Sequence, residues 1–302
     1  MTSDLIGKWR RRHWKADPEV LAAYAGLRPL VLITGGSEGI GLALAERFAS
    51  ASHDLMLVAR TGAALEAAAE KLRSTYRVRV DTIVADVTSD DAIGEIDAGL
   101  KAAGAYADVL INCAGMGLSG RFVDLEDNAL VRLLDLNARA LSRLSLHFLK
   151  GMVARGRGGI LNLASVGSYA PGPYQAAYYA SKAYVLSLSE ALAFECRGLG
   201  VHVCALAPGP VRTRFHERMG ATRAAYRMLM PFSLSKPSHV AWMGYMGFTL
   251  GLRVVVPGPI NLLGVVIMRV LPHRLLLPAV AFLLRPWRRK AAPRNGSPAA
   301  GT

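Results

Sequence analysis

The sequence predicts an α/β fold in which helices cover both faces of a parallel sheet. Three observations support this prediction. Apolar runs alternate with helical stretches between residues 30 and 256, and this alternation is typical of right-handed βαβ units. A glycine-rich segment at residues 35–41 joins the first apolar run to the first helical stretch. A serine follows the apolar run at residues 158–164, and ligands of open α/β sheets bind at the carboxyl ends of the strands.

The first strand is expected at residues 30–34, which read L-V-L-I-T. Residues 35–41 read G-G-S-E-G-I-G, and a helical stretch then extends to Phe48. Glycines let the backbone approach a ligand closely, and the helix N-terminus offers unpaired N–H groups to a pyrophosphate. The strand, turn and helix together predict a phosphate-binding cradle.

The same turn permits another interpretation. Gly35, Ser37 and Gly39 match the G-x-S-x-G nucleophile elbow of serine hydrolases. Such an elbow normally follows several strands, one of which supplies an oxyanion loop. Residues 30–34 form the first predicted strand, so no earlier strand can play that part. A serine hydrolase that uses Ser37 is therefore a remote alternative.

The second strand is expected at residues 54–60 and ends in Ala59-Arg60. In dinucleotide-binding folds an acidic residue near this point binds the ribose 2′-hydroxyl, whereas an arginine accommodates a 2′-phosphate. Arg60 therefore favours NADP(H) over NAD(H). The alternative for Arg60 is a surface charge at the end of a strand.

The remaining elements continue the alternation. Strands are expected at residues 79–84, 108–111, 158–164, 202–207 and 254–256, and helices at residues 62–76 and 89–102. Pro208 ends the sixth strand because proline cannot donate a ladder hydrogen bond. A further helix is expected to begin near Lys236.

Ser165, Tyr178 and Lys182 form the pattern with the clearest chemistry. Tyr178 and Lys182 are four residues apart, so in a helix their side chains share one face. A phenol titrates near ~10, and the charge of Lys182 would lower that pKa. Tyr178 could then act as a general acid or base. Taken alone, Tyr178 is also typical of packing on a helix, and Lys182 of a solvated charge.

Together these motifs resemble the short-chain dehydrogenase/reductase (SDR) family over residues 30–256. T-G-G-S-E-G-I-G at residues 34–41 is similar to the family's T-G-x-x-x-G-x-G cofactor turn, and N-C-A-G at residues 112–115 to its N-N-A-G motif. The spacing of Ser165, Tyr178 and Lys182 matches S-x12-Y-x-x-x-K. P-G-P-V-R-T at residues 208–213 resembles the family's P-G-x-V-x-T segment.

The resemblance implies a Rossmann-like, doubly wound sheet of seven strands and a hydride-transfer chemistry. Tyr178 would donate a proton to a carbonyl oxygen that Ser165 hydrogen-bonds. Lys182 would lower the pKa of Tyr178 and bind the nicotinamide ribose, and Asn137 would hold a proton-relay water. The implied catalytic residues are Asn137, Ser165, Tyr178 and Lys182. The implied cofactor-binding residues are Thr34, Gly35, Ser37, Glu38, Gly39, Ile40, Gly41, Arg60, Asp86, Val87, Asn112, Ala114, Gly115, Tyr178, Lys182, Pro208, Gly209, Val211 and Thr213.

The C-terminal third is both apolar and basic. The chain is 52% hydrophobic with a formal net charge of +14, and after Glu217 it contains twelve Lys and Arg but no Asp or Glu. This combination predicts that residues 257–290 lie on an anionic membrane surface, with a dimer interface as the alternative. The uncharged runs at residues 254–268 and 275–284 are shorter than the roughly 20 residues that span a bilayer.

The sequence divides into four parts. They are a basic, aromatic arm at residues 1–29, an NAD(P)-binding catalytic domain at 30–256 with a substrate lid at about 211–235, the membrane or dimerisation segment at 257–290, and a disordered tail at 291–302. The arm lacks the apolar core of a signal peptide, so export is not indicated. Cys113, Cys196 and Cys204 are typical of small buried hydrophobes in a reducing compartment. No Cys/His cluster has metal-ligand spacing, so we expect no metal.

These observations predict an NADPH-dependent oxidoreductase acting on a lipophilic ketone, aldehyde, ketoacyl or steroid-like substrate, in either direction. We expect a cytoplasmic homodimer or homotetramer in peripheral contact with the inner face of the membrane. One alternative is a catalytically silent binding protein that keeps this fold at a membrane surface. A nucleic-acid partner is suggested only by the net charge, and we expect none because the basic residues alternate with apolar runs.

Overall fold

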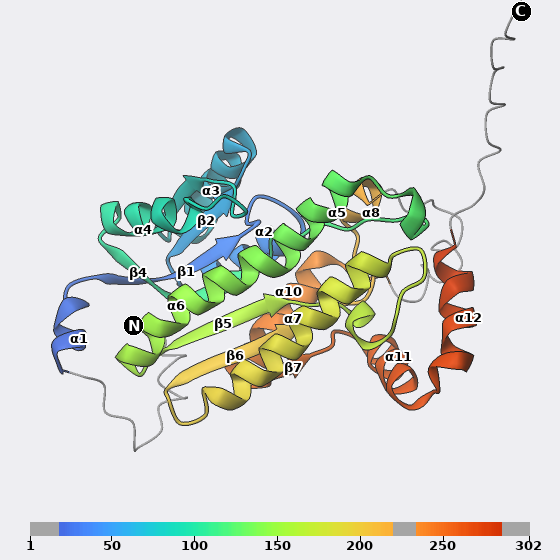
Figure 1. The fold of residues 1–302 in the computed structure, drawn as a ribbon. Helices are drawn as coiled ribbons and strands as arrows, with labels where there is room; N and C mark the ends of the chain where they lie inside the picture. Colours follow the sequence, from blue (N-terminus) through green and yellow to red (C-terminus); the bar gives the residue numbers. More distant parts are fainter. Residues whose placement is uncertain (1–17, 220–233, 286–302) are drawn as a thin grey trace, which may run out of the picture.

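Seven parallel strands form one sheet at the centre of the chain (Figure 1), in the order β3-β2-β1-β4-β5-β6-β7. The computed structural model describes residues 18–219 and 234–285. The strands are β1 Arg28–Thr34, β2 Leu55–Ala59, β3 Val80–Val84, β4 Ala105–Asn112, β5 Gly158–Leu163, β6 Val201–Leu206 and β7 Val254–Val255. The predicted seven-stranded, doubly wound parallel sheet is confirmed.

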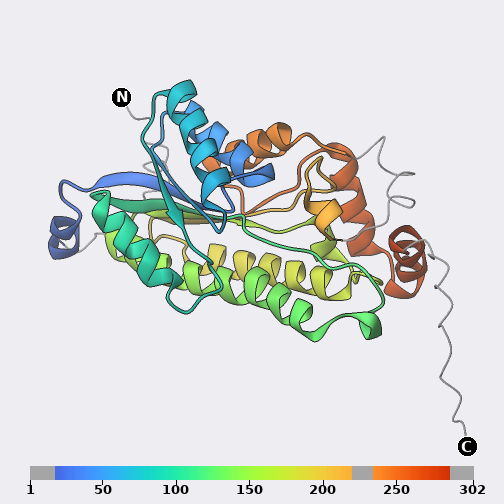
Figure 2. The same cartoon turned by 90° about the horizontal axis from the view of Figure 1, so that it is seen from above.

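Helices cover both faces of this sheet, as the view from above shows (Figure 2). The α-helices of the described residues are α1 Pro18–Ala23, α2 Gly39–Ser50, α3 Gly62–Tyr76, α4 Ala92–Ala102, α5 Asp127–Leu134, α6 Leu141–Arg155, α7 Ala176–Glu195, α8 Phe215–Arg218, α10 Pro237–Thr249, α11 Pro259–Val270 and α12 His273–Leu284. Helices α2, α3 and α10 lie on one face, and α4, α6 and α7 on the other. A π-helical turn, Asp135–Ala140, joins α5 to α6.

The two faces explain why the strands are apolar throughout. Side chains alternate along a strand, so Val31 and Ile33 of β1 pack in the core under α2, α3 and α10. Leu30 and Leu32 of the same strand pack in the core against α4 and α6. Because helices cover both faces, a strand with a polar face would leave unpaired groups in the interior.

Several element boundaries differ from the sequence-based expectations. Strand β4 begins at Ala105 rather than residue 108, because residues 105–107 pair with the first residues of β1. Helix α4 begins at Ala92 rather than residue 89, because residues 86–91 form turns in which Thr88 hydrogen-bonds to Asp86. The pattern of apolar residues along the sequence predicts neither boundary. The start of β4 depends on pairing with β1, which is distant in sequence, and the start of α4 depends on hydrogen bonds within the preceding loop.

The order of the strands creates the site. From β1 the chain passes outward to β2 and β3, then returns to place β4 on the other side of β1. The loops that follow β1 and β4 therefore diverge, and a ligand can bind between them. They approach closely at one point, where a Cβ on Gly35 would lie 3.0 Å from the backbone of Ala114.

The C-terminal helices pack at the same end of the molecule as the carboxyl ends of the strands (Figure 1). Leu276 and Val280 of α12 pack on Ala170, in the loop after β5. Asn261 of α11 is buried, and its Nδ2 donates to the Pro257 carbonyl at 2.6 Å. Within residues 18–219 and 234–285, no helix combines the length and apolar character needed to cross a membrane.

Part of the predicted arm and lid lies outside the described residues. This applies to residues 1–17 of the arm, to 220–233 of the lid, to 286–290 of the predicted membrane or dimerisation segment and to the predicted tail at 291–302. Of the arm, α1 and Tyr24 are described, and the guanidinium of Arg155 lies 4.4 Å from the ring centroid of Tyr24 and 4.6 Å from that of Tyr106. This stack holds the start of the described chain against α6.

Candidate active site

A cavity of about 990 Å³ opens at the carboxyl ends of the strands, between the loops after β1, β4, β5 and β6. Most of the predicted site residues line it. They are Gly35, Ser37, Glu38, Gly39, Ile40, Gly41, Arg60, Asp86, Ala114, Gly115, Ser165, Tyr178, Lys182, Pro208, Gly209, Val211 and Thr213. Four predicted residues, Thr34, Val87, Asn112 and Asn137, do not line the cavity.

The glycine-rich turn has the shape that a dinucleotide requires. Gly35 and Gly39 adopt φ angles of 68° and 60°, a region that residues with a side chain rarely enter. A Cβ on Gly41 would collide with the Gly35 carbonyl, so only glycine lets the turn fold this tightly. The N-cap residue Glu38 makes no side-chain cap hydrogen bond, and the first turn of α2 lines the cavity. The turn therefore fits a pyrophosphate.

Two predicted cofactor residues instead support this turn from below. The hydroxyl of Thr34 accepts hydrogen bonds from the backbone N–H groups of Cys113 and Ala114, each at 3.2 Å. Nδ2 of Asn112 donates to Ser145 Oγ at 3.0 Å and to Asn162 Oδ1 at 2.9 Å. Both side chains are buried. They join β1, β4 and β5 and so support the cavity wall. Their contact with a cofactor stays a prediction.

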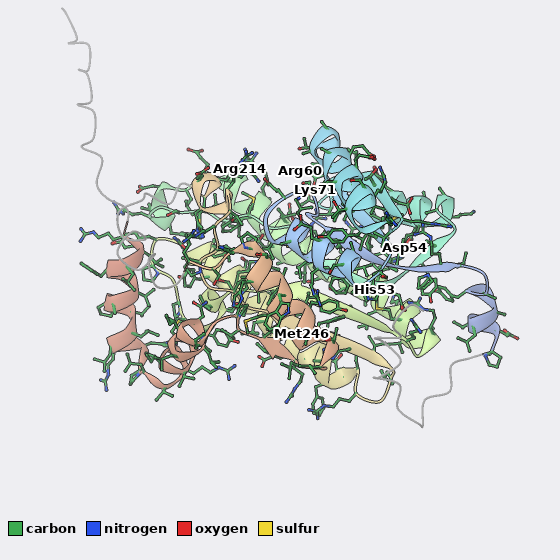
Figure 3. The ribbon with its side chains drawn as sticks, turned by 180° about the vertical axis from the view of Figure 1, so that it is seen from behind. His53, Asp54, Arg60, Lys71, Arg214 and Met246 are labelled. Atoms are coloured by element: carbon green, nitrogen blue, oxygen red, sulfur yellow. The ribbon has the colours of Figure 1, made fainter. Side chains whose placement is uncertain are left out.

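At one end of the cavity, next to the carboxyl ends of β2 and β3, a guanidinium group faces a carboxylate. Arg60 lies 3.8 Å from Asp86, and both side chains are exposed. Burial would raise the pKa of Asp86, but hydrogen bonds from Thr88 N and Oγ1 and the charge of Arg60 outweigh it and hold the pKa below its usual range. Thr88 lines the cavity where Val87 was predicted to do so. Figure 3 labels Arg60, which follows β2, and Lys71, which belongs to α3.

Lys182 is a buried ammonium at the centre of the cavity wall. It is 4% exposed, and its Nζ donates to the Leu163 carbonyl at 2.7 Å. Burial lowers its pKa to about 8, although nearby Cys113 raises it slightly. Burial also raises the pKa of the Cys113 thiol to about 12, so that thiol stays neutral at pH 7. Gly115 lies next to the ammonium on the cavity wall, and a Cβ at this position would lie 3.6 Å from Nζ. A side chain at position 115 would therefore stand between the ammonium and a ligand in the cavity.

Ser165 and Tyr178 line the same cavity as this ammonium. Ser165 caps the 3₁₀ turn Val166–Tyr169, and its Oγ accepts from Gly167 N at 3.1 Å. Since that bond uses the oxygen as acceptor, the hydroxyl proton can be donated to a ligand. Tyr178 occupies the same face of α7 as Lys182, and its ring centroid lies 5.6 Å from that of Phe215.

Asn137 belongs to the π-helical turn and is 1% exposed. Its Oδ1 accepts from Met116 N at 2.9 Å, and its Nδ2 donates to the Met116 carbonyl at 2.8 Å and to Ser181 Oγ at 3.0 Å. These bonds use both amide protons and one lone pair of Oδ1. Asn137 therefore holds the loop after β4 against α7, and its role in holding a proton-relay water stays a prediction.

Several cavity residues escaped the sequence-based prediction. They include Met116, Arg132, Gly167, Gln175 and Tyr179. The cavity is also lined by six residues of the predicted lid at about 211–235, namely Arg212, Arg214, Phe215, His216, Arg218 and Met219. The sequence held a signal for Arg212 and Arg214, which flank Thr213 in the segment after β6. Tyr179 lies against Gly167 and Gly172 and also lines the cavity.

The family model for short chain dehydrogenase matches residues 29–224 of the chain. A very-long-chain 3-oxoacyl-CoA reductase from Bos taurus is 33% identical over 187 residues, which cover 61% of this chain. The chain spans 59% of the length of that relative.

Two solved structures extend the likeness. A short-chain dehydrogenase from Sphingobium yanoikuyae in complex with NADPH is 34% identical with a TM-score of 0.71, covering 87% of this chain and 98% of that one. A 3-ketoacyl-(acyl-carrier-protein) reductase from Brucella melitensis complexed with NADH is 27% identical with a TM-score of 0.66, covering 76% and 95%. Because the family match spans both the glycine-rich turn and the Ser165 to Lys182 segment, the chain belongs to the short-chain dehydrogenase/reductase family of oxidoreductases.

Proposed function

We propose that the protein is an NADPH-dependent oxidoreductase that reduces the carbonyl of a lipophilic substrate to an alcohol, or catalyses the reverse. One observation carries the proposal, namely the buried ammonium of Lys182 one helical turn from Tyr178, at the wall of a cavity with a glycine-rich phosphate turn. A buried positive charge next to a phenol stabilises its phenolate. A catalytically silent binding protein would not need this costly burial.

The cofactor, when bound, supplies the hydride. The backbone N–H groups at the start of α2 would hold its pyrophosphate, and Arg60 would hold a 2′-phosphate. Asp86 would contact the adenine, and Lys182 would bind the nicotinamide ribose. Val211, Thr213 and the Pro208-Gly209 turn line the same cavity and would also contact the cofactor.

The proton chemistry belongs to α7 and the turn after β5. Tyr178 donates a proton to the carbonyl oxygen as that oxygen gains negative charge. Ser165 donates a hydrogen bond to the same oxygen. Asn137 positions the loop after β4 through its bonds to Met116, so that the substrate meets a fixed wall.

Arg60 offers a direct test of the cofactor preference. Arg60→Ala is expected to raise the Kd for NADPH about tenfold and to change the Kd for NADH by less than about twofold, because a charge-assisted bond to phosphate is lost. Nicotinamide fluorescence during titration measures both constants. Lys71→Ala is the matched control, since Lys71 is an exposed cation of the following helix, α3, that pairs with Glu46 at 2.8 Å and does not line the cavity. Equal affinity of the wild type for the two nucleotides would contradict the preference.

The surface of α11 and α12 supports the membrane part of the proposal. Nine of its large apolar side chains are exposed, including Val270 at 78% and Phe282 at 69%. They are Ile260, Leu262, Leu263, Val266, Ile267, Val270, Leu271, Leu275 and Phe282. The charged side chains of α11 and α12 themselves are basic, since no acidic residue follows Glu217, and one of them, Arg269, lies 4.0 Å from Glu190 of α7. We propose that an anionic bilayer covers this face, because two copies paired by a two-fold axis would bring the basic side chains of α11 and α12 together.

Vesicle flotation tests this assignment. Wild-type protein is expected to float with vesicles of phosphatidylglycerol and phosphatidylcholine, and less so at high salt. The variant Leu263→Glu/Ile267→Glu is expected to lose flotation, because it places two carboxylates on the lipid-facing side. Leu250→Glu changes an equally exposed leucine on another element and should leave flotation intact. If the double variant instead changed the oligomeric state, a second copy of the chain would be the occupant.

We further propose a homodimer or homotetramer, as commonly found in the family, and a substrate lid at residues 211–235. Phe215 and Met219 give the described part of this lid an apolar inner surface, which suits a lipophilic substrate.

A further inference from the structure

A short turn after β5 is connected to helix α7 through one serine hydroxyl. The turn is the 3₁₀ segment Val166–Tyr169, and Ser165 is its N-cap residue. Ser168 Oγ donates a hydrogen bond to the Lys182 carbonyl at 2.7 Å and accepts one from the Ser165 backbone N–H at 3.3 Å. A hydroxyl has one proton and two lone pairs, so it can make both bonds at once. Ser168 therefore joins the backbone of Ser165 to the backbone of Lys182.

The two backbones that Ser168 joins carry the groups of the proposed chemistry. Ser165 begins the turn, and Tyr178 and Lys182 lie one helical turn apart on α7. The Lys182 ammonium also donates to the Leu163 carbonyl at 2.7 Å, two residues before Ser165. Helix α7 is thus bonded to the segment after β5 at two points, through Lys182 Nζ and Ser168 Oγ.

Other hydrogen bonds of the turn lead away from α7. Ser165 Oγ accepts from Gly167 N at 3.1 Å, within the turn itself. Val166 N donates to the Pro208 carbonyl at 3.0 Å, in the loop after β6. These bonds fix the turn relative to itself and to β6. Its position relative to α7 depends on the hydroxyl of Ser168.

The turn and the helix would both stay folded without this hydroxyl. The guanidinium of Arg269 lies 5.0 Å from the ring centroid of Tyr169, and Ala170 packs against α12. The Lys182 carbonyl lies inside α7, where it also accepts the regular helical hydrogen bond from the residue four positions later. Removing the Ser168 hydroxyl is therefore expected to change the placement of the turn more than the stability of the fold.

Building on the proposed function, we infer that Ser168 is a positioning residue, which holds the Ser165 hydroxyl where it and Tyr178 can reach the same carbonyl oxygen. Ser168 does not line the active-site cavity, so it acts through Ser165 rather than on a ligand. A misplacement of about 1 Å can cost roughly 10²-fold in rate. Without the hydroxyl of Ser168, the Ser165 backbone can shift relative to α7, while the glycine-rich turn after β1 keeps its shape.

Ser168→Ala tests this role, with rates measured by the reduction of decanal and 2-decanone with NADPH. We expect kcat to fall about tenfold. The KM for the carbonyl compound and the Kd for NADPH should stay within about twofold of the wild type, because an interaction that places groups for the transition state affects kcat. Ser168→Thr keeps the hydroxyl and should restore kcat. A second cavity of about 570 Å³ lies beside Ser168 and leaves room for the added methyl group.

Ser189→Ala is the matched control for a general loss of packing. Ser189 Oγ accepts from Asn162 Nδ2 at 3.0 Å and donates to the Val185 carbonyl at 2.6 Å, so it also joins β5 to α7. Neither Ser189 nor these two partners line the active-site cavity. Ser189→Ala should lower the free energy of unfolding at least as much as Ser168→Ala and keep kcat within about twofold of the wild type.

A double-mutant cycle shows whether Ser168 acts through Ser165. Ser165→Ala removes the hydroxyl that Ser168 is inferred to place. In that background, adding Ser168→Ala should lower kcat by less than about twofold, because coupled residues are not additive. A full additional loss of about tenfold in the double variant would overturn the inference.

Hydrogen exchange of the Ser165 amide, followed by NMR, needs no turnover. It should become at least about tenfold faster in Ser168→Ala and return to the wild-type rate in Ser168→Thr, because the amide loses and regains its acceptor. Unchanged exchange, or a wild-type kcat in Ser168→Ala while Tyr178→Phe is impaired, overturns the inference and leaves the proposed function standing. If the wild type reduced no carbonyl compound, the proposed function would fail, and faster exchange would still support the placement of Ser165 by Ser168.

Discussion

Tyr178→Phe is expected to lower kcat for carbonyl reduction by about 10²–10⁴-fold, the usual contribution of a general acid or base. The substitution removes one hydroxyl and keeps the ring, whose neighbours are Tyr179 and Phe215. Folding and NADPH affinity should therefore stay close to those of the wild type. Stopped-flow absorbance of NADPH gives the rate, and nicotinamide fluorescence gives the affinity.

Tyr179→Phe is the matched control for this experiment. It removes a hydroxyl from the neighbouring position of α7, where the ring rests against Gly167 and Gly172. The proposed chemistry needs the phenol of Tyr178, and so Tyr179→Phe should keep kcat within about threefold of the wild type. If Tyr178→Phe kept full activity while Tyr179→Phe lost it, the proton donor would be Tyr179.

Lys182 should give the reaction a pH limit near 8. Burial lowers the pKa of its ammonium to about 8, so the charge beside Tyr178 is lost as the pH rises through that value. The reductive kcat/KM, which reports the free enzyme, is expected to fall about tenfold per pH unit above this point. Lys182→Met should lower kcat/KM by about 10²-fold at pH 7 and remove the break at pH 8. A break that persisted in Lys182→Met would belong to another group.

The lowered pKa of Lys182 also predicts how the free energy of unfolding changes with pH. The direction of the change follows from the number of protons that the folded and unfolded chains bind. Lysine titrates near ~10.4 in an unfolded chain, above the value of about 8 in the fold. Between these values the unfolded chain binds more protons, so the free energy of unfolding rises with pH. The wild type should gain stability relative to Lys182→Met from about pH 8 to pH 10, as denaturant titrations at each pH can measure. If the difference in free energy of unfolding between the two proteins did not change from pH 8 to pH 10, burial would not lower the pKa of Lys182.

Much of the fold was predictable because its causes are local. Strands buried on both faces must be apolar along their whole length, and β1 and β2 are recognisable for that reason. The glycines at positions 35, 39 and 41 are recognisable because no other residue fits the turn that they form. Helix α3 begins and ends where the sequence predicted, since its Ala- and Leu-rich pattern is bounded by Gly62 and by Arg77 in the left-handed conformation.

The roles of individual polar residues were harder to predict. Thr34, Asn112 and Asn137 belong to motifs associated with the cofactor and catalysis, yet their side chains bond to the protein interior. A sequence motif records that a residue type is required at a position. It does not distinguish a residue that contacts a ligand from one that holds such a residue in place.

By itself, the sequence determined the parallel α/β sheet, the phosphate turn and the spacing that sets Lys182 one helical turn from Tyr178, because periodicity and short-range geometry decide these. Only the tertiary structure decided how deeply Lys182 is buried, which hydroxyl joins Ser165 to α7, and which apolar side chains of α11 and α12 stay exposed. Burial and side-chain hydrogen bonding depend on segments far apart in the chain, which meet only when the sheet order brings their ends together.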